Sequence, residues 1–272
     1  MHEFPSGEYA HSEIMAGDVM VHTLAKQADA VWPREQWWFE RLDSTAYPNV
    51  LDVGCGPGEI TLRLARDLGF SSITGMDLEP RIIDIANQRA RDVDNVSFTV
   101  GDATALPFED NRFDLAVNRH MLQVVPSPEK VIREMARVVR PGGLLYFLVE
   151  DYGMINGAPV VPDLFWHRIQ PGLQKRASDL FVGRKCYGLL KSLGFEEIGC
   201  HYASPDTINT PAEVWEGIFR FWSEGYAAFI SEACDLPVEE AKAHFQAYID
   251  DVHHPEGYVV WHLPVFTVRN PT

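Results

Sequence analysis

The sequence predicts an α/β protein with a doubly wound, mostly parallel sheet. Between Asn49 and Glu150, short apolar runs typical of buried strands alternate with runs of helical period. A glycine-rich turn joins the first strand to the first helix, and polar residues directly follow several strands. In an open parallel sheet, ligands bind at the carboxyl ends of the strands. The sequence therefore predicts a ligand site at that edge.

The glycine-rich turn has the spacing of a nucleotide cradle without a pyrophosphate site. Gly54, Gly56 and Gly58 allow positive φ and a close approach of the backbone to a ligand. A pyrophosphate loop would place its third glycine at position 59, which is Glu59. An acid at this helix start would repel phosphate, but it is compatible with a ligand that carries an amino group and a sulfonium. A tight turn without a ligand is the alternative.

Acidic residues mark the ends of the first three strands. Asp52, inside an otherwise apolar strand, is suited to holding a charged or hydroxylated ligand. Asp77 lies 19 residues after Gly58, where an acid accepts hydrogen bonds from ribose hydroxyls; a solvated turn acid is the alternative. Asp102 could accept from an adenine amino group while Ala103 donates its amide, but an Asx turn would show the same pattern.

The fourth strand, residues 113–117, brings three polar residues to the same edge: Asn118, Arg119 and His120. The following helix is predicted to end at Pro141-Gly142-Gly143, before a fifth strand. His120 is the leading candidate for a general base, because imidazole titrates near neutral pH. A polar packing role for His120 is the alternative reading.

The segments around this core divide the chain into four parts. Residues 1–45 are predicted to form a helical cap, 46–203 the α/β core, 204–257 a helical insertion called the lid, and 258–272 a final core strand. Pro264 should lie at a bulge or on an edge strand, because proline cannot donate to a central ladder.

The lid is predicted to cover an apolar substrate. Thr210 and Pro211 are expected to be the N-cap and first residue of its first helix, which carries a dense aromatic face. Core packing could explain about half of these rings, and the others would wall a pocket. The expected substrate-binding residues are Tyr9, Tyr152, Trp215, Phe219 and Trp222.

Composition and charge narrow the function classes. The net charge of −16 disfavours nucleic acids and anionic membranes as partners. No apolar run is long enough to span a membrane and the first residues lack a signal-peptide pattern, so we expect a cytoplasmic protein. The four cysteines lack metal-ligand spacing and are expected to be reduced. His253 and His254 have no acid partner at ligand spacing, and no metal site is expected.

Five motifs in order give the core a specific resemblance. They are D-x-G-x-G-x-G at residues 52–58, the acid Asp77, the Gly-Asp-Ala of residues 101–103, LPFEDNRFD at residues 106–114, and RPGG at residues 140–143. Residues 50–150 thus resemble the core of the class I S-adenosylmethionine-dependent methyltransferases, in the subgroup of the ubiquinone/menaquinone-type and many small-molecule enzymes. Outside this core the resemblance thins.

The resemblance implies a fold, a cofactor and roles for individual residues. The fold would be a seven-stranded Rossmann-like sheet whose last two strands pair antiparallel, and the cofactor S-adenosyl-L-methionine. Asp52, Gly54 and Gly56 would contact its methionine part, Asp77 its ribose, and Asp102 with Ala103 its adenine. The full set of expected cofactor-binding residues is Asp52, Gly54, Cys55, Gly56, Gly58, Asp77, Leu78, Asp102, Ala103, Asn118 and Arg119.

The expected reaction is in-line methyl transfer to oxygen or carbon of a small, partly apolar molecule. Residues 118–121 lack the Asn/Asp-Pro-Pro-Tyr/Phe run with which related enzymes hold a planar amino nitrogen, which argues against N-methylation of bases or amides. Two alternatives stay open: a cofactor-binding protein that catalyses a rearrangement or cyclisation, and a non-catalytic cofactor-binding partner. The protein is expected to be a monomer or homodimer.

Overall fold

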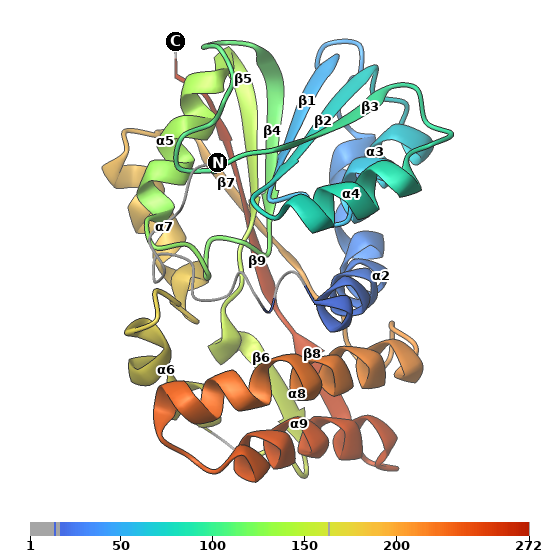
Figure 1. The fold of residues 1–272 in the computed structure, drawn as a ribbon, viewed down its shortest axis with the longest axis vertical. Helices are drawn as coiled ribbons and strands as arrows, with labels where there is room; N and C mark the ends of the chain where they lie inside the picture. Colours follow the sequence, from blue (N-terminus) through green and yellow to red (C-terminus); the bar gives the residue numbers. More distant parts are fainter. Residues whose placement is uncertain (1–13, 15–16, 163, 272) are drawn as a thin grey trace.

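The computed structural model describes residues 14, 17–162 and 164–271, and it confirms the predicted fold class (Figure 1). A seven-stranded sheet has the order β3-β2-β1-β4-β5-β9-β7, and its first five strands are parallel. β9 is antiparallel to both neighbours, as expected for the last strands. The strands are β1 Asn49–Val53, β2 Ser72–Asp77, β3 Val96–Val100, β4 Phe113–Arg119, β5 Val139–Leu148, β7 Ile198–Ala203 and β9 Leu263–Arg269.

The strands alternate their buried side chains between two helical layers. Leu144, Tyr146 and Leu148 of β5 belong to one core cluster, while Leu145 and Phe147 belong to the other. This period of two is what a sheet covered on both faces requires. The helices in the described residues are α2 Asp18–Glu40, α3 Glu59–Asp67, α4 Pro80–Arg89, α5 Pro128–Val138, α6 Phe165–Gln174, α7 Val182–Ser192, α8 Ala212–Cys234 and α9 Val238–His253, with a 3-10 turn, η1, at Tyr152–Met154.

The lid forms a layer of its own beyond the strand ends of the main sheet, with α8 and α9 side by side (Figure 1). A second, two-stranded sheet lies beside them, formed by β6 (Ile155–Ala158) and β8 (Tyr258–Trp261). The aromatic face of α8 belongs to the same core cluster as α2 and one face of the main sheet. None of the helices in the described ranges is long and apolar enough to cross a membrane.

Three predicted boundaries were wrong. α5 ends at Val138, and the Arg-Pro-Gly-Gly run after it lies inside β5, next to a register shift against β4. β4 continues two residues further than predicted, to Arg119. α8 begins at Ala212, so Pro211 is its N-cap rather than its first residue, and no side chain caps the helix.

The C-terminal segment forms two strands in two sheets, where one strand was predicted. Pro264 lies in β9, between β5 and β7, and not on an edge strand. Its position explains why it is tolerated there. Pro264 is the second residue of the strand, and its carbonyl accepts from Val149, just beyond the end of β5. The missing N–H of Pro264 therefore removes a hydrogen bond only at the end of the pairing between β5 and β9.

Candidate functional site

The glycine-rich turn lies at the carboxyl end of β1 and is tied to β2. The amides of Gly54 and Cys55 donate to the carbonyl of Met76, and the amide of Gly56 donates to Asp77 Oδ2 at 2.9 Å. Gly54 and Gly56 have φ of +73° and +54°. A Cβ on Gly54 would lie 2.5 Å from Met121 Sδ, and one on Gly56 would lie 3.1 Å from Leu24 Cδ1. The turn therefore leaves no room for side chains.

Two buried carboxylates flank this turn. Thr61 Oγ1 donates to Asp52 Oδ2 at 2.6 Å, and burial raises the pKa of Asp52 to about 6. Burial also raises the pKa of Asp77, although the amides of Glu79 and Gly56 donate to it. Removal from water disfavours the charged form of a carboxyl group. Both acids would gain from a ligand that supplies positive charge or hydrogen-bond donors.

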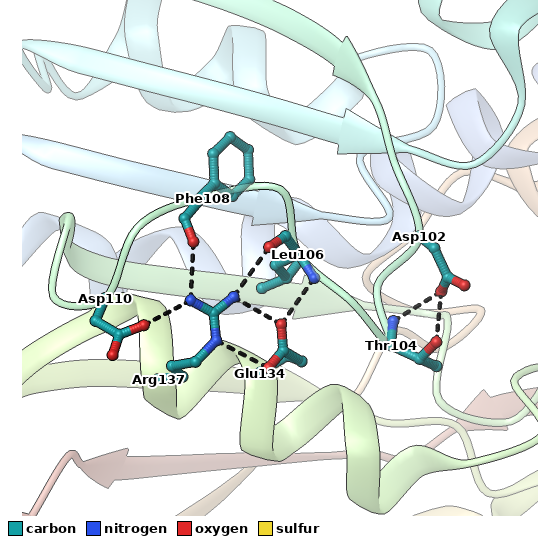
Figure 2. Close-up of polar contacts among 7 residues, drawn as sticks. All are labelled: Asp102, Thr104, Leu106, Phe108, Asp110, Glu134 and Arg137. Atoms are coloured by element: carbon teal, nitrogen blue, oxygen red, sulfur yellow. Dashed lines mark hydrogen bonds and ion pairs between the residues drawn. The ribbon is translucent and has the colours of Figure 1, made fainter.

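Asp102 is held at the same edge by a clamped loop (Figure 2). Its Oδ1 accepts from the amide and hydroxyl of Thr104, so the Asx-type turn is present. Beyond it, Arg137 of α5 donates to the carbonyls of Leu106 and Phe108 at 2.9 and 2.8 Å. Arg137 also pairs with Asp110 and Glu134, and Glu134 accepts from the Leu106 amide. The LPFEDNRFD run thus fixes the loop that carries Asp102.

Arg119, at the end of β4, joins the edge of the sheet to the cap. Its Nε lies 2.8 Å from Glu35 of α2, which also accepts from the Tyr146 hydroxyl at 3.0 Å. Glu35 is fully buried, and Arg119 is 9% exposed. Arg119 Nη2 is buried and has no hydrogen-bond partner among the described residues. One donor of this guanidinium is therefore available to an anionic group. Neighbouring Asn118 donates to the carbonyl of Val53 at 2.9 Å.

The glycine turn, the strand-end acids and Arg119 line two pockets that share five residues and are together called here the first cavity. Its larger part has a volume of about 790 Å³, measured out to the solvent, and includes the ends of β2 and β3. Its smaller part reaches Asp52 and the start of α3, and both parts share Leu24, Gly54, Gly56, Arg119 and His120. Of the residues predicted to bind the cofactor, the two parts together include Asp52, Gly54, Cys55, Gly56, Asp77, Leu78, Asp102, Ala103 and Arg119.

Two residues predicted for this site lie beside it. Gly58, at the N-cap of α3, approaches Phe98, because a Cβ there would lie 2.9 Å from the ring. It allows helix and strand to pack closely. Asn118 is fully buried and orients the strand ends through its bond to Val53. The structure gives both of these residues packing contacts, and neither lines the first cavity.

His120 lines the first cavity and is paired with Glu150. Its Nδ1 is 2.6 Å from Glu150 Oε1, and its Nε2 is buried without a hydrogen-bond partner among the described residues. The φ of His120 is +52°, so the backbone turns sharply where β4 ends. Because Glu150 follows β5, the two neighbouring strands bring acid and imidazole together. A carboxylate on Nδ1 favours the tautomer whose Nε2 can accept a proton.

A second cavity, of about 490 Å³, adjoins the first and shares Val124 with it. Tyr152 and Trp222, both predicted to bind substrate, line it. Trp215 and Phe219 line neither cavity: they are fully buried, and the Phe219 ring stacks on Tyr248 with 4.5 Å between centroids. Tyr9 lies outside the described residues.

Sequence reasoning missed Glu35, Tyr146 and Glu150. Glu150 follows the fifth strand, so the rule that identified Asp77 could have found it. Glu35 shares a helix face with Ala28, Trp32 and Phe39 at spacings of three and four, and a lone acid on an apolar face is a signal for a buried partner. The partner itself, Arg119, is 84 residues away and is not visible from the sequence pattern.

Comparison with known proteins agrees with this geometry. Residues 51–147 match the family model described as "Methyltransferase domain". The chain is 41% identical over 110 residues to methyltransferase GfsG of Streptomyces halstedii, covering 39% of each protein. It is 32% identical over 157 residues to a demethylmenaquinone methyltransferase of Shouchella clausii, covering 57% of this chain and 66% of the relative. It therefore spans less than two thirds of the length of both relatives.

A solved structure extends the likeness beyond the core. The crystal structure of the [4+2]-cyclase SpnF has a TM-score of 0.56 and 25% sequence identity, covering 91% of this chain and 82% of that chain. The matched domain contains the glycine turn and the strand-end acids that line the first cavity. Residues 51–147 therefore form a methyltransferase domain of the class I S-adenosylmethionine-dependent kind, whose cofactor is S-adenosyl-L-methionine.

Proposed function

We propose that this protein transfers the methyl group of S-adenosylmethionine to an oxygen or carbon atom of a small, partly apolar molecule bound in the second cavity. One observation supports this most directly. Both cavities include Val124 in their lining. His120, which is paired with Glu150, lines the first cavity and lies three residues before Gln123, which lines the second. Cofactor and acceptor would then meet beside a base.

The residues of the first cavity fit the cofactor. The free donor of Arg119 suits the methionine carboxylate, and buried Asp52 suits the methionine ammonium. Asp77 can accept from ribose hydroxyls, and Asp102 with Ala103 would border the adenine. The bound cofactor supplies an electrophilic methyl group whose departure turns a sulfonium into a neutral thioether. The glycine turn allows close contact, because it places no Cβ in this space.

His120 would hold the proton that the acceptor loses. Its Nε2 accepts the proton from an acceptor hydroxyl or acidic carbon, and Glu150 orients the ring and stabilises the imidazolium that forms. The aromatic walls of the second cavity exclude water and fix the acceptor. Positioning of two reactants can contribute ~7–11 kcal/mol, so binding and orientation carry much of the rate.

Cofactor binding is tested by thermal unfolding. S-adenosylmethionine and its demethylated product at ~100 times Kd should each stabilise the protein by ~2.7 kcal/mol and raise Tm by several degrees. NAD should give no shift, because Glu59, paired with Arg89, stands at the helix start where a pyrophosphate would bind. Scanning fluorimetry at matched ligand concentrations measures this, and equal stabilisation by NAD would contradict the cofactor assignment.

Cofactor affinity should depend on pH through Asp52. In the free protein Asp52 is half protonated near pH 6, whereas a bound ammonium favours its ionised form. Binding therefore releases a proton at low pH, and Kd should rise about tenfold between pH 7.5 and pH 5. Titration calorimetry across this range measures it. Asp52→Asn should bind more weakly and without this pH dependence. A dependence that persists would come from Asp77 or Glu79, whose pKa values burial also raises.

The likeness to SpnF favours one alternative, a rearrangement or cyclisation in which the cofactor is bound but not consumed. The His120–Glu150 pair could move protons in such a reaction as well. Mass spectrometry of cell extracts with and without the gene separates the two. Methyl transfer predicts a product heavier than its precursor by one CH₂, together with release of S-adenosylhomocysteine. An isomer of equal mass, with S-adenosylmethionine unchanged, would support the cyclase and contradict methyl transfer.

A further inference from the structure

The second cavity has an uncharged, aromatic lining. Among the described residues that border it, none has a charged side chain. Tyr152 and Tyr226 stay protonated at neutral pH, because burial, and after it the nearby charge of Glu150, raises the pKa of both phenols. The lining residues are Gln123, Val124, Tyr152, Trp166, Leu173, Ser178, Leu180, Trp222, Tyr226, Phe229, Ile230 and Phe245.

The aromatic rings that line the second cavity pack against one another. The Tyr152 ring lies 4.7 Å from Trp166 and 5.6 Å from Trp222, and the two tryptophans meet edge to face at 87°. Such walls bind flat apolar molecules well, because aromatic rings offer a large area with few rotatable bonds. An anion would face the negative charge of Glu150 and no cation in the lining. Burying a charge of either sign in this uncharged lining would cost free energy, so the lining favours a neutral ligand whose flat rings can pack against its own.

Gln123 adds one specific polar group to this wall. Its Nε2 donates to the carbonyl oxygen of His120 at 2.8 Å, which fixes the orientation of the amide, since a carbonyl oxygen there would be repelled. Oε1 therefore points elsewhere; it is buried and has no hydrogen-bond partner among the described residues. The whole residue is only 5% exposed. A buried carbonyl oxygen without a donor is rare, and it is satisfied when a ligand brings one.

We propose that the second cavity takes an uncharged molecule with a flat apolar ring system and a hydroxyl group that donates a hydrogen bond to Gln123 Oε1. The proton that His120 takes up then comes from a second hydroxyl or from a carbon of the ring. This rests on the proposed function, since it names the acceptor class of that same site. Because the Gln123 amide is hydrogen-bonded to the backbone of His120, the ligand hydroxyl would be held on the side of the cavity nearest the His120 imidazole. Gln123 would thus select methyl acceptors that carry a hydrogen-bond donor.

Binding without turnover tests this proposal. Titration calorimetry is done in the presence of excess S-adenosylhomocysteine, using four naphthalenes that differ in one group: 2-naphthol, 2-methoxynaphthalene, 2-naphthoate and 2-naphthylmethylammonium. We expect 2-naphthol to bind about tenfold more tightly than 2-methoxynaphthalene, because only the hydroxyl satisfies Gln123. Both charged probes should bind more weakly than 2-naphthol. Tightest binding by the cation or the anion would overturn the neutral class.

Variants of Gln123 test whether this residue causes the preference for the hydroxyl-bearing probe. Gln123→Leu and Gln123→Met should reduce the preference for 2-naphthol over 2-methoxynaphthalene to about twofold or less, since both remove Oε1 at similar volume. Gln246→Leu, an exposed glutamine of α9, is the control and should keep the preference. A preference that survives both Gln123 variants, with Tm near that of the unmodified protein, would refute the role of Gln123.

The cofactor titration separates this inference from the proposed function. If S-adenosylhomocysteine binds and no naphthalene does, the acceptor class is wrong and the cofactor site stands. If 2-naphthol binds with the expected preference but S-adenosylhomocysteine does not, the cavity is assigned correctly and the methyl-transfer proposal fails. Equal affinity for 2-naphthol and 2-methoxynaphthalene in the unmodified protein also refutes the hydroxyl contact, without any variant that must fold.

Discussion

His120→Asn is expected to lower kcat by a factor of ~10²–10⁴, the usual contribution of a positioned general base. Asparagine cannot take up the proton, but it tolerates the left-handed φ of +52° at this position better than most residues. The fold should therefore survive. The first cavity keeps its acids and glycine turn, so S-adenosylmethionine should bind within about twofold of its normal Kd. Release of S-adenosylhomocysteine in the presence of acceptor measures kcat, and calorimetry measures Kd.

Glu150→Gln is the matched control for this result. The amide keeps the size of the side chain and can accept from Nδ1, but it removes the charge that stabilises the imidazolium. Its kcat should fall less than that of His120→Asn, with a changed pH profile. If His120→Asn retains its kcat while both proteins bind cofactor normally, His120 is a packing residue, and methyl transfer here depends on positioning alone.

The alternation of strands and helices predicted the fold, because each βα unit is local in sequence. The turn at Gly54 and the acid Asp77 could be placed on one edge by the same rule, since all parallel strands end there. Strand boundaries failed where a longer-range partner decided them. β5 begins at Val139, before the Arg-Pro-Gly-Gly run, because Phe113 of β4 pairs with Val139. A proline is tolerated in β9 because β5 ends beside it.

The site was less predictable where its parts come from distant segments. Trp215, Phe219 and Trp222 have the same spacing signal, yet only Trp222 reaches the second cavity. The Phe219 ring stacks on Tyr248 of α9, and the Trp215 ring stacks on Phe219. Gln123 has no motif at all. Its significance arises from the bond to His120 and from the cavity formed by α6 and α8, which no local pattern describes. Glu35 likewise acquires a role only when α2 packs against β4.

Gly56→Val should raise the Kd for S-adenosylmethionine at least about a hundredfold, roughly 2.7 kcal/mol. The new side chain would enter the first cavity, where Gly56 lies, and its Cβ would also come within 3.1 Å of Leu24 Cδ1. Part of any effect on stability comes from the positive φ of +54°, which a β-branched residue tolerates poorly. A control with the same strain but no ligand nearby is therefore needed.

Gly69→Val provides that control, because Gly69 has a φ of +67° and a Cβ there meets nothing within 4 Å. Both variants should lose ~1–2 kcal/mol of folding free energy to backbone strain. Only Gly56→Val should lose cofactor affinity, and Gly69→Val should bind as the unmodified protein does. Denaturant unfolding and calorimetry on the two proteins measure these quantities. Parallel loss of affinity in both variants would show that strain, and not occupied space, weakens binding, and the glycine turn would then have no direct contact with the cofactor.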